Sequence, residues 1–106
     1  MDCYDLNILL EDSFRMDMYF DSGFSMFNKS KFEHTSYSLW ALDELESYIC
    51  KQIGGQKVSI NEMIRLTKLF QRQMRRYWEK KQDPHSMFRA AIDILDDVLD
   101  LLRATR

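Results

Sequence analysis

Seven basic residues lie between positions 59 and 82, where only two acidic residues, Glu62 and Glu79, accompany them. The basic residues are Arg65, Lys68, Arg72, Arg75, Arg76, Lys80 and Lys81. Lys and Arg spaced along a helix can neutralise phosphates and release counterions, so Arg65, Lys68, Arg72, Arg75 and Arg76 form a candidate nucleic-acid-binding surface. Tyr77 and Trp78 could stack on bases if they were exposed. Both continue the apolar spacing of this segment, however, so burial is predicted for them, and a solvated basic face is the preferred interpretation.

Two other groups of residues could support chemistry but lack the spacing that chemistry requires. Asp93, Asp96, Asp97 and Asp100 flank apolar positions and are predicted to point away from them, toward Arg72, Arg75 or Arg76. His34 and His85 have no Cys or His at metal-ligand spacing. There is no nucleophile motif and no glycine-rich phosphate loop. The sequence therefore predicts a protein that is not an enzyme and that uses no metal or cofactor.

Aromatic and methionine side chains are concentrated near the N-terminus. The candidate partner-binding set is Phe14, Met16, Met18, Phe20, Phe24, Met26 and Phe27. Aromatic residues and Met are enriched at the centres of protein interfaces. The alternative is that these side chains close the open side of a helical core.

The first fifty residues carry ten acidic residues against three basic ones. If this region is helical, its acids could line one side and imitate the phosphates of a nucleic acid, as an inhibitor of a nucleic-acid-binding enzyme would do. The acids in question are Asp2, Asp5, Glu11, Asp12, Asp17 and Asp21.

Composition limits the remaining possibilities. The chain has 106 residues and a formal charge of −2, which predicts one domain and no general affinity for nucleic acid or membranes. The N-terminus lacks the basic start of a signal peptide, and no apolar run has the length of a membrane span. Cys3 and Cys50 lie far apart without a CxxC context, so two reduced thiols and a cytoplasmic location are predicted.

Helical periodicity predicts the elements that position these residues. Apolar residues recur at three- and four-residue steps over about 36–53, 59–82 and 84–104. Thr35 or Ser36 is expected to cap the first helix, and Gly54-Gly55 to end it. Ser59 with Glu62 forms a capping-box pattern for the second, and Asp83-Pro84 is a start signal for the third. Residues 4–20 are expected to form a further helix, with a hairpin across 21–23 as the alternative.

The last predicted helix carries two adjacent apolar seams. One contains Phe88, Ile92, Leu95, Leu99 and Leu102, and the other contains Met87, Ala91, Ile94, Val98 and Leu101. Two seams require two packing partners, which a homodimer or another element of the same chain could supply. The sequence thus predicts a single all-α domain, a small antiparallel helical bundle. Its predicted function is that of a non-catalytic protein-interaction module, a regulator or inhibitor with a protein partner, and nucleic-acid binding is the alternative.

Overall fold

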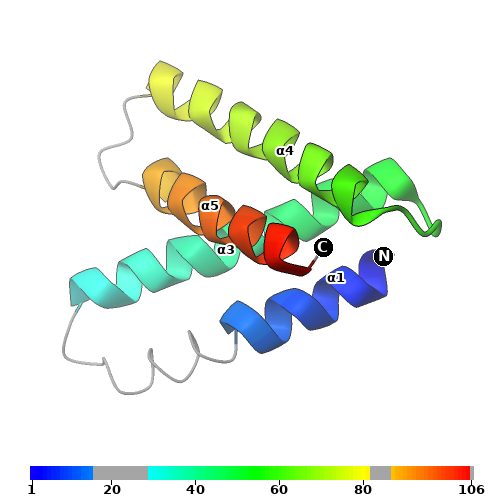
Figure 1. The fold of residues 1–106 in the computed structure, drawn as a ribbon. Helices are drawn as coiled ribbons and strands as arrows, with labels where there is room; N and C mark the ends of the chain where they lie inside the picture. The colour runs from blue at the N-terminus through cyan, green and yellow to red at the C-terminus, as the bar shows by residue number, and fades with distance from the viewer. Residues whose placement is uncertain (16–28, 82–86, 106) are drawn as a thin grey trace.

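The computed structural model describes residues 1–15, 29–81 and 87–105 and is helical throughout almost all of them (Figure 1). Helix α1 spans Cys3–Leu10 and continues as a π-helical turn, η1, over Glu11–Arg15. Helices α3, α4 and α5 span Lys29–Ile53, Ile60–Lys81 and Met87–Thr105. No strand occurs in the described part of the chain, which confirms the predicted all-α class.

The boundaries between α3 and α4 follow the predicted signals. Gly54 adopts φ +62°, a left-handed conformation that glycine tolerates best, and its N–H donates to the Cys50 carbonyl at 3.0 Å. Ser59 Oγ accepts the Glu62 N–H at 3.1 Å and caps α4. The Glu62 side chain, however, accepts hydrogen bonds from Arg65 rather than completing a capping box.

The start of α3 differs from the prediction. The helix begins at Lys29 instead of near position 36, so Thr35 and Ser36 lie inside it rather than capping it. Residues 29–35 contain no Gly or Pro, and a single Ser or Thr does not stop a helix that can continue. The N-terminal helix is present through Arg15. The alternative hairpin across 21–23 and the Asp83-Pro84 start signal lie outside the described residues.

Helix α5 is the centre of the bundle. It packs against both α4 and α3, while α1 packs against α3 (Figure 1). Both of its apolar seams are buried or half-buried inside the one chain. Helices α3 and α4 therefore supply the two packing partners that the seams require, and a homodimer stays a prediction. The fully buried side chains of the core include Leu6, Leu10, Leu42, Leu45, Ile49, Met63, Leu95, Val98 and Leu102.

The predicted burial of Tyr77 and Trp78 is wrong. Burial along α4 stops at Met74, and Tyr77 and Trp78 are 49% and 38% exposed. Periodicity identifies which face of a helix is apolar, but burial also requires neighbouring side chains that cover the whole residue. The last turns of α4 therefore present two large aromatic side chains partly to solvent.

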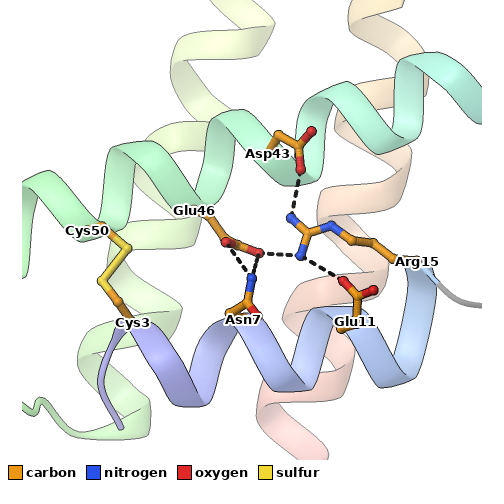
Figure 2. Close-up of polar contacts among 7 residues, drawn as sticks. All are labelled: Cys3, Asn7, Glu11, Arg15, Asp43, Glu46 and Cys50. Carbon is orange, nitrogen blue, oxygen red and sulfur yellow. Dashed lines mark hydrogen bonds and ion pairs between the residues drawn. A yellow bond between two sulfur atoms is a disulfide. The ribbon is translucent and has the colours of Figure 1, made fainter.

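Helix α1 is joined to α3 by a disulfide, which corrects the prediction of two reduced thiols. Cys3 and Cys50 are bonded, with their Cα atoms 5.6 Å apart (Figure 2). Sequence separation concealed the pairing because the antiparallel arrangement of α1 and α3 brings the start of one helix beside the end of the other. Disulfides persist mainly in oxidising compartments, so the cysteines no longer support the cytoplasmic location predicted from the sequence.

Arg15 provides a second link between the same elements. Its guanidinium is buried and contacts Asp43 at 2.8 Å, Glu46 at 2.5 Å and Glu11 at 3.5 Å (Figure 2). Asn7 Nδ2 donates to both oxygens of the same Glu46 carboxylate, at 3.3 Å and 3.1 Å. Cys3, Asn7, Glu11 and Arg15 are spaced four residues apart, so this row of side chains holds α1 and η1 against α3.

Candidate functional site

A row of four cations follows the exposed side of α4. Lys68, Arg72, Arg76 and Lys80 are exposed and spaced four residues apart, so neighbouring members lie one helical turn apart on the same side. We call this set the cationic row. Like charges at this spacing destabilise a helix by about 0.2–0.5 kcal/mol per pair. The row is therefore an arrangement that a bound anion would stabilise.

Arg65 lies three residues before Lys68 and so falls outside this row, and it is also neutralised locally. Its Nε donates to Glu62 Oε2 at 2.9 Å, and a second hydrogen bond joins the same two side chains. The pairing raises the pKa of Arg65 and lowers that of Glu62. Of the five residues proposed from the sequence as a nucleic-acid surface, Arg65 is thus the one with a carboxylate partner on its own helix.

A cleft of about 510 Å³ lies between α4 and α5. Among the described residues it is lined by Lys68, Gln71, Arg72 and Arg75 from α4, with Asp96, Leu99, Asp100 and Arg103 from α5. Gln71 is buried there, and its Nε2 donates to the Ile92 carbonyl at 3.0 Å and to Asp96 Oδ1 at 2.6 Å. The amide thus fixes one of the two carboxylates of the cleft.

Two of the four α5 acids, Asp96 and Asp100, line the cleft together with Arg72 and Arg75, but no ion pair crosses the cleft among the described residues. Asp96 accepts the hydrogen bond from Gln71, and Asp100 lies 3.5 Å from Arg103. Within the described residues, Lys68, Arg72 and Arg75 form no ion pair. Arg76 lines a different pocket. The cleft therefore keeps cations that are available to an external anion.

A second pocket, of about 360 Å³, lies farther along α4 and contains an aromatic ring. Among the described residues it is lined by Gln73, Arg76, Tyr77 and Lys80. The Tyr77 ring stacks on Phe88 of α5, with ring centroids 6.1 Å apart and planes inclined by 22°. Phe88 in turn contacts Trp40 edge-on at 6.1 Å. Side chains from α3 and α5 therefore support the Tyr77 ring.

The predicted N-terminal partner surface falls almost entirely outside the described residues. Phe14 is half-buried and packs against the core, while Met16, Met18, Phe20, Phe24, Met26 and Phe27 lie in the part that is not described. This surface stays a prediction.

Three of the four described acids that could imitate phosphates have internal roles. Asp2 and Asp5 form the capping box of α1, and Glu11 pairs with Arg15. Hydrogen bonds to Asp5, acting against a smaller effect of burial, lower the pKa of Asp2. Asp12 is exposed, and Asp17 and Asp21 lie outside the described residues.

Within the part of the chain that is described, no cluster of His, Cys, Asp and Glu is placed to hold a metal ion. The described helices include none long and apolar enough to cross a membrane. The cationic row was visible in the sequence as a four-residue repeat, whereas the exposure of Tyr77 had no sequence signal. No protein-family model, curated protein or solved structure matches this chain.

Proposed function

We propose that this protein is a non-catalytic binding module that holds a nucleic acid by its phosphate backbone on the exposed side of α4. The observation that carries the proposal is that Lys68, Arg72 and Arg75 line one cleft and have no ion-pair partner among the described residues. A regulator or inhibitor could act through such a surface without performing chemistry.

The physical basis is counterion release. A phosphate that approaches a Lys or Arg displaces the cations condensed on the nucleic acid, and this release drives binding at low salt. The cationic row extends about 18 Å, at a rise of about 1.5 Å per residue over the twelve steps from Lys68 to Lys80. Binding would also relieve the repulsion between neighbouring members of the row.

A protein partner is supported less well by the described geometry. The N-terminal aromatic surface predicted for such a partner is not described beyond Phe14, and Phe14 packs against the core. An acidic protein segment could also approach α4. The partly exposed rings of Tyr77 and Trp78 at the end of the same helix favour a nucleic acid, because bases stack on aromatic side chains.

The test compares two single charge reversals. Arg72→Glu changes the centre of the cationic row, and Lys57→Glu makes the same change in charge at an exposed position in the connection before α4. Binding of a fluorescein-labelled oligonucleotide is measured by anisotropy over a range of salt concentrations. We expect Arg72→Glu to weaken binding and to reduce the slope of log K against log salt by about 1. Lys57→Glu should bind with an affinity and a salt dependence close to those of the unmodified protein.

The controls separate the possible partners. Labelled polyglutamate is titrated under the same conditions, and tighter binding of polyglutamate than of the oligonucleotide would assign the basic side of α4 to an acidic protein. Absence of oligonucleotide binding at low salt would contradict the proposal, as would equal effects of the two reversals.

A further inference from the structure

The pocket beside Tyr77 combines the chemical groups that a single nucleotide needs. Its described residues offer the Tyr77 ring, the amide of Gln73 and the cations of Arg76 and Lys80. We propose, on the basis of the function proposed above, that this pocket takes an unpaired base, so that α4 binds single-stranded nucleic acid in preference to a duplex.

Continuity with the cationic row gives the first argument. Arg76 and Lys80 are members of the row and also line the pocket. A nucleic-acid strand whose phosphates contact Lys68, Arg72 and Arg76 therefore passes beside the Tyr77 ring. No separate attachment site is needed, because the same cations that hold the backbone stand beside the ring.

The support of the ring gives the second argument. Tyr77 is 49% exposed but is not a free side chain, since it stacks on Phe88, which in turn contacts Trp40. A ring held by packing loses little conformational entropy when a base stacks on it. These contacts thus hold the aromatic ring of Tyr77 in position before a base binds.

The space around the ring gives the third argument. An adjoining pocket of about 250 Å³ shares Gln73 and Tyr77 with the first and is also lined by Glu44 and Lys51. Polar groups from both α3 and α4 therefore lie near the Tyr77 ring. In a duplex the bases are already stacked and paired, and placing one of them here would cost a few kcal/mol of unstacking. An unpaired base avoids that cost.

The experiment measures the preference of the protein for single strands and its dependence on the Tyr77 ring. An oligonucleotide of mixed sequence is titrated alone and as its duplex. Tyr77→Leu keeps an apolar side chain against Phe88 but removes the aromatic ring, and Tyr77→Phe keeps the ring. Tyr4→Leu, on α1, is the matched control, because Tyr4 is exposed and lines neither the cleft nor the two pockets described above. Circular dichroism checks the folding of each variant.

We expect Tyr77→Leu to weaken single-strand binding by about tenfold while leaving duplex binding unchanged, as removal of one stacking ring does elsewhere. Tyr77→Phe and Tyr4→Leu should both bind like the unmodified protein. If Tyr77→Leu does not fold, the preference of the unmodified protein still decides the matter.

Equal affinity for single strand and duplex would overturn the inference and leave the proposed function intact, and so would a folded Tyr77→Leu variant with unchanged binding. Absence of binding to either form at low salt would mean instead that the proposed function is wrong, and the inference would fall with it.

Discussion

Arg15 is a charged side chain in a buried position, and three carboxylates make this possible. Burial acts to lower the pKa of its guanidinium, but the hydrogen bonds and charges of Glu46 and Asp43 outweigh it, so the pKa is raised. The guanidinium can serve several acceptors at once because it presents five donors in a planar fork. Only Glu46 of these acceptors is itself largely buried, which makes it the main partner.

Replacing Arg15 with Met should test this link. We expect Arg15→Met to lower the free energy of unfolding by about 2 kcal/mol, because a hydrogen-bonded charge is lost and the buried Glu46 carboxylate remains without it. Urea denaturation followed by circular dichroism gives the value.

The matched control is Arg65→Met, which removes an exposed ion pair on α4 and should cost no more than about 1 kcal/mol. Glu46→Gln completes a double-mutant cycle with Arg15→Met. A coupling energy near zero would show that the two side chains do not stabilise each other.

At the scale of an element, α5 combines a buried apolar side with an acidic one. Asp93, Asp96, Asp97 and Asp100 lie within two turns of the helix and are exposed. Although Asp97 is exposed, the surrounding protein removes part of its hydration, and this desolvation, followed by the charges of Asp100, Asp96 and Asp93, raises its pKa. A raised carboxyl pKa means that the folded protein binds a proton more readily than the unfolded chain does.

The sign of the pH effect follows from this shift. The contribution of Asp97 to stability is fully present below the unfolded pKa, about 3.9, and is lost as the pH rises through the higher folded pKa. Asp97→Asn should therefore raise the free energy of unfolding at pH 7 by about 0.5 kcal/mol, as removal of like-charge neighbours on a helix does. Urea denaturation at pH 7 and pH 3 measures the difference, which should disappear at pH 3 and shrink in high salt. The same gain at both pH values would contradict this explanation.

The helices differ in how well the sequence predicted them. The observed bounds of α4 agree with the prediction to within one residue at each end, because an apolar stripe, a Ser59 cap and a preceding Gly pair all indicate the same start. The start of α3 was misplaced because only one weak signal, a possible Thr35 or Ser36 cap, supported it. Consistent local signals therefore decided which boundaries could be predicted.

At the scale of the whole molecule, the disulfide constrains most of the N-terminal half. It joins residues 47 positions apart and so closes a large loop in the unfolded chain. Loss of that constraint costs roughly 4 kcal/mol in the chain-entropy model, and 2–4 kcal/mol is typical in practice.

Reduction should accordingly lower the free energy of unfolding by about 2–4 kcal/mol. Urea denaturation with and without dithiothreitol measures the change. The double variant Cys3→Ser with Cys50→Ser is the control. Its free energy of unfolding should equal that of the reduced protein and should not change when dithiothreitol is added. Thiol titration of the denatured, unreduced protein should find no free thiol, and two free thiols would restore the interpretation made from the sequence.

The charge segregation of the chain is not cancelled within the described fold. Asp43, Glu46 and Glu11 are engaged by Arg15, while Asp96 and Asp100 are engaged by Gln71 and Arg103. The cationic row therefore keeps its charge, and this is why we propose nucleic-acid binding, the alternative from the sequence, in place of the protein-interaction function.

The sequence by itself determined the helical class, the bounds of α4 and the four-residue spacing of Lys68, Arg72, Arg76 and Lys80, because periodicity, capping and charge are properties of neighbouring residues. Only the tertiary structure decided that Cys3 meets Cys50, that Arg15 is buried among carboxylates and that Tyr77 is exposed. Each of these depends on which element stands beside a residue at a given height in the bundle. Apolar spacing indicates which face of a helix points to the core, but it does not indicate how far the neighbouring helix extends along that face.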